Sequence, residues 1–243
     1  MGGMSPPFRL VAGAPAPLQQ SSVTCGAACL TVARMLVDDP FARWVRDGTG
    51  HPVLGAEGES PAERFASYER TVHRRTNGLT VGRTGIRPPW PRALGTPPWG
   101  ARAELENGAS TIGTRYAYQP LRHLGREARL AAYDRLVDRV HHGEPALLYV
   151  GNRTMPRHVT LVLPGDGDRV LDIYDPGRGT VRVAERDAFV EGRLALSGWQ
   201  QPWLLVQPTG HRRVRARAGG ALEALHLPRL STEPTPEALQ RSR

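Results

Sequence analysis

The sequence predicts an α+β fold, in which an N-terminal helical part packs on a C-terminal antiparallel β-sheet. Two observations support this prediction. Apolar residues between positions 25 and 37, and between 126 and 142, recur every three or four residues, which is the spacing of one helix face. After residue 145 the pattern changes to short apolar runs separated by turn residues, which is typical of strands joined by hairpins.

The helices of the N-terminal part begin and end at recognisable signals. Asp38, Asp39 and Pro40 end the first helix, because a proline lacks the N–H that a helix interior needs. Ser60, followed three positions later by Glu63, predicts a capping box at the start of another helix. The predicted helices cover residues 25–37, 41–46, 60–75, 102–108 and 126–142, and a strand is predicted at 114–119.

The C-terminal part is predicted to be a sheet with one short helix. Gly and Asp residues at 165–168, and the sequence Asp-Pro-Gly-Arg-Gly at 175–179, are strong turn signals between apolar runs. The predicted strands cover residues 145–151, 158–163, 169–174, 180–183 and 203–207, with the helix at 185–190.

Composition divides the chain into three sections. Residues 1–16 are rich in Gly, Pro and Ala and predict an irregular lead-in. Residues 17–208 form the predicted domain, with a helical and Pro/Trp-rich insertion at about 47–120. Residues 209–243 hold seven Arg against three Glu and little hydrophobic periodicity, which predicts an Arg-rich, mostly disordered tail.

The overall composition is that of a globular protein, with 40% hydrophobic and 23% charged residues among 243. No run of about 18 apolar residues is present, which argues against a membrane span. The first twenty residues carry Arg9 as their one basic residue, and no apolar core of a signal peptide follows. The expected location is therefore the cytoplasm, or outside the cell after export without a cleaved signal.

The charge of the chain is strongly basic, with a formal net charge of +9, and all 32 basic residues are Arg. We interpret the absence of Lys as the result of GC-rich codons; avoidance of lysine modification is the alternative. A basic protein can attract nucleic acid. No aromatic-interleaved basic platform or nucleic-acid motif accompanies the charge, which argues against such a partner.

Cys25 lies where a polar loop gives way to an apolar helix. A thiol at a helix N-terminus lies at the positive end of the helix dipole, beside N–H groups without a helical partner, and both favour the thiolate. Thr24 is in position to be the N-cap, and Gly26 allows another chain to approach closely, which makes Gly26 a candidate substrate-binding residue. The side-chain amide of Gln19 is the expected donor to an oxyanion beside the thiol, with Gln20 as the alternative.

Cys29 lies one helical turn after Cys25, and the chain has no other cysteine. A disulfide between positions i and i+4 of one helix has poor geometry, so we expect two thiols in a reducing compartment. We interpret Cys29 as a packing residue. The histidines show no metal-ligand spacing, so neither a metal site nor a cofactor is predicted.

His158 begins a predicted strand, and Asp175 ends the next one. In an antiparallel hairpin, paired residues have numbers that average to the centre of the turn. The average of 158 and 175 is 166.5, which falls inside the predicted turn at 165–168. The sequence therefore predicts that the two side chains lie nearly opposite each other, where the carboxylate would fix the imidazole tautomer and stabilise the imidazolium.

These residues resemble the motifs of papain-like cysteine peptidases. The closest likeness is to the peptidase domains of bacteriocin-processing transporters, which cut double-glycine leaders, and to their free-standing relatives. It covers about residues 17–42 and 140–207. The matching motifs are Gln19-x5-Cys25-Gly26-x-Ala28-Cys29-Leu30, then His158-x3-Val162, and then Asp175-Pro176-x2-Gly179.

The resemblance implies a papain-like fold and a bacterial thiol hydrolase that acts on a peptide or protein. By this likeness Cys25 is the nucleophile and His158 is the general base and acid. Asp175 orients the imidazole, and Gln19 donates to the oxyanion together with the Cys25 backbone N–H. The implied reaction passes through an acyl-enzyme.

Three functions remain open at the level of the sequence. The first is a cysteine peptidase or amidase that hydrolyses a peptide or isopeptide bond. The second is a transamidase or acyltransferase that passes the same acyl-enzyme to an amine, where the absence of Lys limits self-modification. The third is a non-catalytic papain-fold module that binds peptide through Trp90 and Trp99 of the Pro-rich loop. The indoles of these two tryptophans either contact a ligand or anchor the loop on the core. The sequence does not indicate an oligomeric state.

Overall fold

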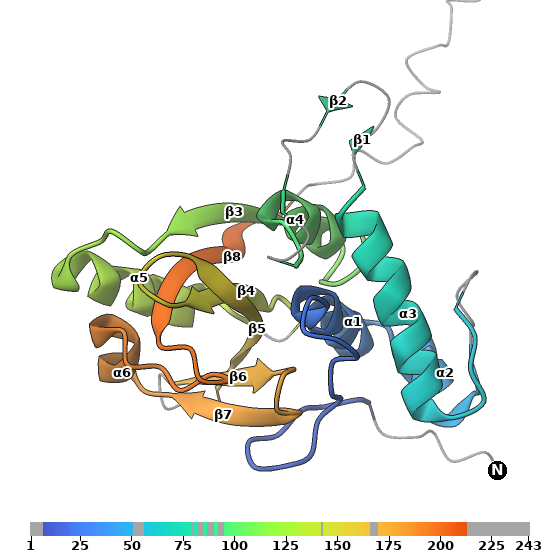
Figure 1. Cartoon of the computed structure of the whole chain (residues 1–243). Helices are drawn as coiled ribbons and strands as arrows, with labels where there is room; N and C mark the ends of the chain where they lie inside the picture. Colours follow the sequence, from blue (N-terminus) through green and yellow to red (C-terminus); the bar gives the residue numbers. More distant parts are fainter. Residues whose placement is uncertain are drawn as a thin grey trace, which may run out of the picture. The chain divides into compact units, whose positions relative to one another are not determined.

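The structure is a computed structural model that describes residues 7–50, 56–78, 80–81, 85–86, 90–91, 95–141, 143–165 and 170–212. The predicted tail beyond residue 212 and most of the predicted hairpin turn at 165–168 lie outside the described residues. The described chain confirms the predicted α+β class, with helices concentrated in the N-terminal part and an antiparallel sheet formed mainly by the C-terminal part (Figure 1).

The predicted helices and strands occur in the predicted order, but the strands β1 and β2 were not predicted and β8 is longer than predicted at both ends. The main sheet has six strands in the order β3-β8-β4-β5-β6-β7, and all its pairings are antiparallel. The helices of the described chain are α1 (Cys25–Val37), α2 (Asp39–Asp47), α3 (Pro61–Thr76), α4 (Pro98–Glu106), α5 (Arg126–Arg139) and α6 (Arg186–Glu191). The strands of the main sheet are β3 (Thr114–Pro120), β4 (Ala146–Gly151), β5 (Pro156–Pro164), β6 (Leu171–Asp175), β7 (Thr180–Ala184) and β8 (Gln201–Arg212), and a small separate sheet pairs β1 (Thr80–Val81) with β2 (Gly85–Ile86).

Side-chain caps determine where two of the helices begin. The Asp38 carboxylate accepts a hydrogen bond of 3.0 Å from the Phe41 N–H, so α2 starts earlier than predicted and includes Pro40 in its first turn. At the start of α3, the Ser60 hydroxyl accepts from the Glu63 N–H, and the Glu63 carboxylate accepts from the Ser60 N–H. The predicted capping box is therefore confirmed.

The main sheet is buried on both faces, because alternate residues of its strands face different helices. In β4, Leu147 and Tyr149 belong to the same hydrophobic cluster as α1 to α4, whereas Leu148 and Val150 belong to the cluster of α5 and α6. Figure 1 shows α1, α2 and α3 on one side of the sheet and α5 and α6 on the other. This explains why the strand at 146–151 is apolar without alternation.

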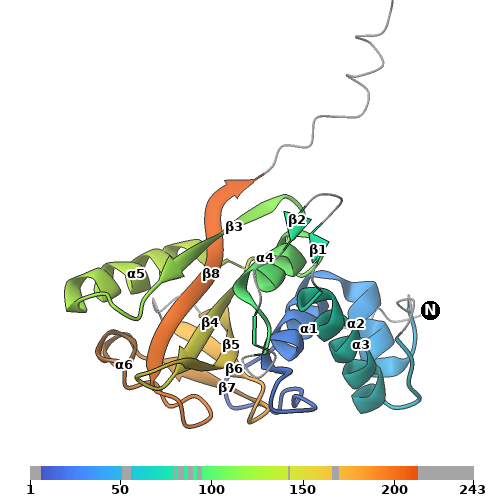
Figure 2. The ribbon, with the colours of Figure 1, turned by 45° about the horizontal axis from the view of Figure 1, so that its top comes forward.

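Helix α1 lies between the sheet and the other helices, and Figure 2 shows it beside α2 and α3. It packs against β5 and α3, and Ala27, Ala28 and Ala33 are fully buried. Small side chains let the neighbouring backbones come close, which fixes the position of the helix tightly. The first residue of this helix, Cys25, is consequently held by the core of the protein.

The segment at about 47–120, which we expected to be an insertion, is part of the same core. Phe65 of α3 and Leu105 of α4 are buried in the cluster that contains α1, and β3 forms one edge of the main sheet. The expected domain end at residue 208 is also too early, because β8 continues to Arg212, which pairs with Thr114. Residues 209–212 are paired but largely exposed, so hydrophobic periodicity gave no signal for this end of the strand.

Part of the predicted irregular lead-in lies along the outer edge of β7. The Gly13 N–H donates to the Val181 carbonyl, and the Ala16 N–H donates to the Gly179 carbonyl at 2.9 Å. These bonds cover some of the backbone groups that an edge strand otherwise leaves unpaired.

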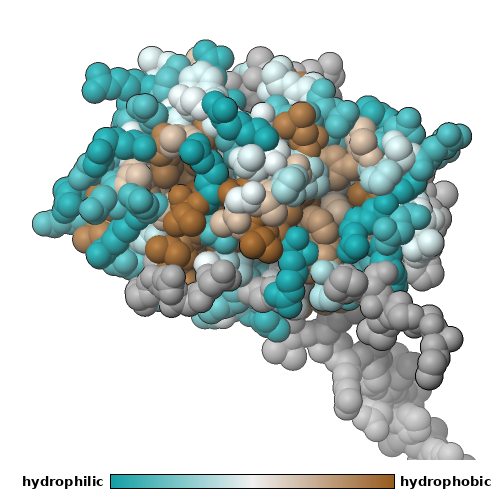
Figure 3. Space-filling model, turned by 90° about the horizontal axis from the view of Figure 1, so that it is seen from below, coloured by the Kyte–Doolittle hydropathy of each residue, from teal (hydrophilic) through white to brown (hydrophobic). Residues whose placement is uncertain are grey.

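The surface of the described chain mixes hydrophilic and hydrophobic side chains. Figure 3 shows one face, where hydrophobic residues gather in patches between hydrophilic ones. The large hydrophobic residues that are exposed in the described chain are Val11, Leu18, Ile112, Tyr118 and Val183. None of the described helices is both long enough and apolar enough to cross a bilayer.

Candidate active site

Cys25 is the first residue of α1, and the residue is only 2% exposed. Thr24 occupies the predicted N-cap position, but its hydroxyl makes no capping bond to the helix. It donates instead to the Ser21 carbonyl at 3.0 Å and accepts from the Ser21 N–H at 3.1 Å. The loop before the helix is thus folded on itself, and the first N–H groups of α1 have no partner within the helix.

His158 on β5 and Asp175 at the end of β6 form a buried pair. The His158 Nε2 lies 2.7 Å from Asp175 Oδ1, and the two side chains are 6% and 0% exposed. The register differs from the predicted one by two residues, because Leu161 pairs with Tyr174 and Val162 pairs with Ile173. His158 and Asp175 therefore meet diagonally across the hairpin, on the same face of the sheet.

His158 also lies near the nucleophile candidate, since the Cys25 side chain is among the groups that raise the pKa of the imidazole. Because Nε2 is hydrogen-bonded to Asp175, Nδ1 is the ring nitrogen that remains available to the thiol. Burial favours the neutral imidazole, but the hydrogen bonds and negative charges of Asp175 and Cys25 outweigh it and raise the pKa of His158 to about 9. At neutral pH this environment favours the imidazolium form of His158.

Asp175 is held by more groups than the sequence suggested. Its Oδ1 also accepts from the Gly177 N–H at 3.0 Å, and the Ser197 hydroxyl lies 2.7 Å and 2.9 Å from the two carboxylate oxygens. Burial would raise the pKa of Asp175, but His158, Ser197 and the Gly177 N–H together lower it. Ser197 was not predicted as a site residue. The Ser-Gly pair at 197–198 is a turn signal, but nothing in the sequence shows which carboxylate the turn faces.

Gln19 lies beside this pair through its backbone, because the Gln19 N–H donates to the Pro176 carbonyl at 3.0 Å. Its side-chain Nε2 donates to the Ser21 carbonyl at 2.7 Å, and an amide nitrogen carries one further N–H. Its Oε1 is buried and has no hydrogen-bond partner among the described residues. Gln20, the alternative donor, directs its Nε2 to the Leu18 carbonyl.

A second loop lies directly over the start of α1. A Cβ placed on Gly26 would lie 2.6 Å from the Thr96 Cβ, so a glycine is needed where the two segments cross. A Cβ placed on Gly95 would lie 3.7 Å from the Cys25 sulfur. The Tyr149 hydroxyl donates to the Thr96 carbonyl at 2.9 Å, which ties this turn to β4. In the described chain the close approach to Gly26 is made by Thr96 of the same chain, and the predicted contact of Gly26 with substrate stays a prediction.

Trp90 and Trp99 contact each other through a T-shaped arrangement, with ring centroids 5.4 Å apart and an interplanar angle of 88°. Both residues are half-buried, and Trp99 lies in the first turn of α4. The Trp90 indole nitrogen is buried without a hydrogen-bond partner in the described part of the chain. This packing is what the anchoring interpretation expects, and a contact with substrate is left as a proposal.

Glu69 is a second residue that the sequence gave no reason to select. It lies on α3 with no exposed surface, and one carboxylate oxygen accepts from the Gln20 N–H at 3.1 Å. The other carboxylate oxygen, Oε2, is buried without a hydrogen-bond partner among the described residues. Burial raises the pKa of Glu69. The loop that carries Gln19 and leads to Cys25 thus rests on a buried carboxyl.

Cys29 is fully buried, and its sulfur lies 3.5 Å from the Val159 carbonyl, to which the thiol donates. Burial, followed by the nearby charges of Cys25, Asp175 and Glu69, raises the pKa of Cys29 well above 9.0. Both cysteines are free thiols. Cys29 is therefore a packing residue with little thiolate character, as expected from the sequence.

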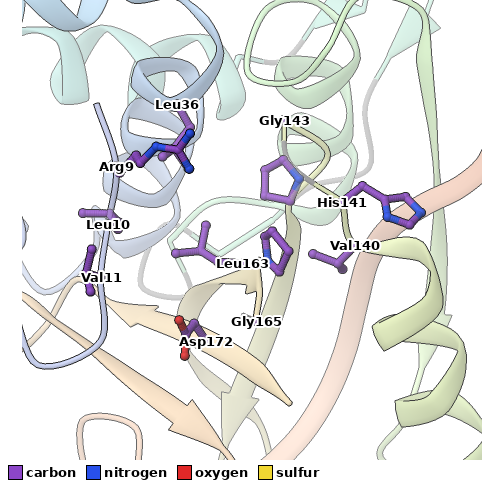
Figure 4. A pocket seen from close by; sticks show the side chains of 12 residues that line it. Arg9, Leu10, Val11, Leu36, Val140, His141, Gly143, Leu163, Gly165 and Asp172 are labelled. Carbon is purple, nitrogen blue, oxygen red and sulfur yellow. The ribbon is translucent and has the colours of Figure 1, made fainter. Parts of the chain in front are cut away.

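The described chain has a cavity of about 480 Å³, but it lies away from these residues. Figure 4 shows it between the N-terminal segment at Arg9, the end of α1 at Leu36, and His141. Leu36 follows Cys25 by eleven residues, which corresponds to about 16 Å along a helix axis. An open hollow of about 740 Å³ adjoins Gln20 and the start of α3.

Among solved structures, the chain is similar to the peptidase domain of Streptococcus ComA, a bi-functional ABC transporter involved in a quorum sensing pathway. That match covers 80% of this chain and 98% of the domain, with 14% identity and a TM-score of 0.39. The chain is also similar to the Pseudomonas avirulence protein AvrPphB, over 79% of this chain and 96% of that one, with 11% identity and a TM-score of 0.37. No protein-family model and no curated protein matches the chain.

Proposed function

We propose that this protein is a papain-like cysteine peptidase or amidase that hydrolyses a peptide or isopeptide bond. The observation that carries the proposal is the 2.7 Å hydrogen bond between the buried His158 and Asp175, with Cys25 near enough to the same imidazole to raise its pKa. Nucleophile, base and orienting carboxylate thus lie close together, at the N-terminus of a buried helix. The low sequence identities and TM-scores of the similar structures add nothing to the assignment of these roles.

The first chemical step is attack of the Cys25 sulfur on the carbonyl carbon of the substrate. A thiolate beside an imidazolium is the reactive form of such a pair, and the raised pKa of His158 favours the imidazolium. Asp175 accepts from Nε2 and leaves Nδ1 directed at the sulfur. The carboxylate thereby fixes both the tautomer and the orientation of the ring.

The oxyanion formed by this attack needs hydrogen-bond donors. The backbone N–H of Cys25 has no partner within the helix, and the Gln19 amide has an N–H beyond the one given to the Ser21 carbonyl. Each such donor contributes about 3–4 kcal/mol to stabilisation of the transition state in hydrolases of this kind. We assign this role to Gln19 because its backbone is fixed next to Pro176, directly after the orienting Asp175.

The remaining steps use the same imidazole twice. His158 gives its Nδ1 proton to the nitrogen of the leaving amine, and the C–N bond breaks to leave a thioester on Cys25. A water molecule then loses a proton to His158 and attacks the thioester, which releases the acid and restores the thiol. No cofactor takes part in these reaction steps. The proposed substrate is a peptide or protein.

The proposal is tested with Cys25→Ala and the matched variant Cys29→Ala. A library of fluorogenic peptides is incubated with each protein, after circular dichroism has shown that both fold. We expect turnover of at least one peptide by the wild type and by Cys29→Ala, and none by Cys25→Ala. Turnover that persists in Cys25→Ala contradicts the assignment of the nucleophile. Binding of peptide by wild type and Cys25→Ala alike, without turnover, supports a non-catalytic module instead.

A transamidase or acyltransferase is the second candidate, favoured by two observations. Cys25 and His158 are only 2% and 6% exposed, which limits access of water to an acyl-enzyme, and the chain contains no Lys that could accept the acyl group. A labelled primary amine added to the peptide assay separates the two reactions. Incorporation of label into the product indicates transfer, whereas the free acid alone indicates hydrolysis.

A further inference from the structure

Ser197 lies in a tight turn that faces the orienting carboxylate. The turn is closed by two backbone hydrogen bonds between Leu196 and Trp199, of 3.1 Å and 2.8 Å. Its central residues are Ser197, with φ of +47°, and Gly198, with φ of +85°. Two consecutive residues with positive φ are the pattern of a type I′ hairpin turn.

The conformation of Ser197 is unfavourable for its residue type. Among the described residues, Ser197 is the only non-glycine residue with positive φ. Left-handed backbone is sterically costly for a residue with a Cβ, and Gly, Asn or Asp are preferred at this turn position. Such local strain is found where the surrounding structure or the function of a site requires it. The geometry of the turn therefore does not explain why a serine occupies position 197.

The contacts of the serine hydroxyl provide an explanation. Ser197 Oγ lies 2.7 Å from Oδ1 and 2.9 Å from Oδ2 of Asp175, so its single proton is shared between the two oxygens. The other protein donors that contact the Asp175 carboxylate, His158 Nε2 and the Gly177 N–H, both bond Oδ1. Asp175 has no exposed surface, so water cannot readily replace a lost donor.

The space around these groups is filled closely. A Cβ placed on Gly177 would lie 2.5 Å from the Ser197 Oγ and 3.2 Å from the His158 Cε1. Ser197, Gly177 and the imidazole ring are therefore packed closely against one another. Small changes here would move the imidazole as well as Asp175.

We propose that Ser197 is a positioning residue that keeps Asp175 ionised and oriented toward His158, and so acts on Cys25 through both. This inference rests on the proposed function, because it gives Ser197 a role in activating the thiol. The ionisable groups of the described chain that interact with Asp175 are His158 on β5, Cys29 on α1 and Tyr174 beside it on β6. Of these, only His158 belongs to the proposed reacting pair.

Two variants separate positioning from a role in the turn. Ser197→Ala removes the hydroxyl and keeps the strained backbone, whereas Ser197→Gly removes the hydroxyl and relieves the strain. The readout is the rate of Cys25 alkylation by iodoacetamide between pH 4 and 8, measured on the full chain by mass spectrometry of peptides. Alkylation follows the thiolate, so its acid limb reports formation of the thiolate–imidazolium pair.

With the hydroxyl gone, Asp175 protonates more readily and supports the imidazolium less. We expect the acid limb to move up by about one pH unit in both variants, which is about a tenfold lower rate on that limb. Thermal unfolding is expected to show Ser197→Gly at least as stable as Ser197→Ala. If Ser197 serves only the turn, the alkylation rate of Cys25 in Ser197→Gly should equal that of the wild type.

The wild type distinguishes failure of this inference from failure of the proposed function. If wild-type Cys25 reacts no faster than a buried thiol such as Cys29, the proposed function itself is wrong. If wild-type Cys25 reacts rapidly and Ser197→Gly keeps the same rate and the same acid limb, only the role of Ser197 is overturned. Ser197→Thr retains a hydroxyl, and recovery of part of the lost rate in this variant further supports the inference.

Discussion

Replacing Asp175 by Asn is expected to lower the pKa of His158 from about 9 toward its ordinary value of 6.5. The amide has nearly the shape of the carboxylate, and its oxygen can still accept from Ser197 and the Gly177 N–H. The substitution therefore removes the negative charge while leaving few buried groups unpaired. Its main effect falls on the protonation of the imidazole.

The size of the effect follows from the environment of His158. An increase from 6.5 to about 9 corresponds to about 3 kcal/mol in favour of the imidazolium. Asp175 and Cys25 share this stabilisation, against the opposing effect of burial. Loss of the carboxylate charge is expected to lower the pKa by one unit or more, which means about tenfold less imidazolium relative to imidazole above the new pKa.

Folding stability provides an independent measure of the same pair. The folded pKa of His158 is higher than its unfolded value, so the resulting stability is fully present below about pH 6.5 and is lost as the pH rises through about 9. Urea unfolding at several pH values, with the wild type and Asp175→Asn compared at each, isolates this contribution from those of other groups. The stability advantage of the wild type from this pair, up to about 3 kcal/mol at pH 6.5, is expected to shrink by pH 10.

The assay for the pKa is an NMR titration of the histidine ring protons, with His158→Gln used to assign the signal. Asp172→Asn is the matched control, because it makes the same substitution on the same strand. The reasoning is refuted if His158 titrates near 6.5 in the wild type. It is also refuted if Asp175→Asn and Asp172→Asn leave the pKa equally high.

Three further predictions concern the surroundings of the pair. Gly177→Ala places a methyl group 2.5 Å from the Ser197 hydroxyl, and we expect it to reduce the iodoacetamide reactivity of the nucleophile about tenfold. Glu69→Gln removes a buried charge whose pKa burial raises, while keeping the acceptor oxygen. Its free energy of unfolding at pH 7 is expected to be equal or about 1 kcal/mol higher, an advantage lost below pH 4.5. Tyr149→Phe removes the hydrogen bond to the Thr96 carbonyl and is expected to cost about 1 kcal/mol in urea unfolding.

Two of these predictions have a matched control. Gly125→Ala adds a methyl group where no atom lies within 4 Å, and it should leave thiol reactivity unchanged. Tyr116→Phe removes a comparable bond to the Pro145 carbonyl, far from the turn beside Cys25. It should destabilise the fold as Tyr149→Phe does without altering Cys25. A loss of more than about 1 kcal/mol in Glu69→Gln would show that the carboxylate charge stabilises the loop.

The contact between His158 and Asp175 could be predicted because both residues adjoin a short hairpin, where pairing follows from residue numbers. The predicted register was wrong by two residues, because apolar spacing indicates the face on which a residue lies but not which residues pair across the hairpin. A shift by two residues preserves the face on which each side chain lies. The carboxylate therefore still reaches the imidazole, although the two residues meet diagonally.

Other features of the site depend on contacts between segments that are distant in sequence. Ser197 approaches Asp175 only after β7 and α6 have folded back on the sheet, and Glu69 reaches the Gln20 N–H from a helix 49 residues away. The sequence around Ser197 and around Glu69 contains no local pattern from which the hydrogen-bond partner of either residue could be predicted. The position of Thr24 at the N-cap of α1 could be predicted. That its hydroxyl donates to the Ser21 carbonyl instead of capping the helix could not.

The central claim, that His158 activates Cys25, is tested most directly by alkylating both cysteines of the folded protein in competition. Wild-type protein and His158→Gln are treated with iodoacetamide near pH 7, and the labelled peptides are quantified by mass spectrometry. Cys29 is the internal control, because it is fully buried and its pKa is raised. We expect Cys25 to react at least about tenfold faster than Cys29 in the wild type, and to lose most of this advantage in His158→Gln. Equal and slow labelling of the two thiols in the wild type, or an unchanged rate in His158→Gln, would contradict the claim.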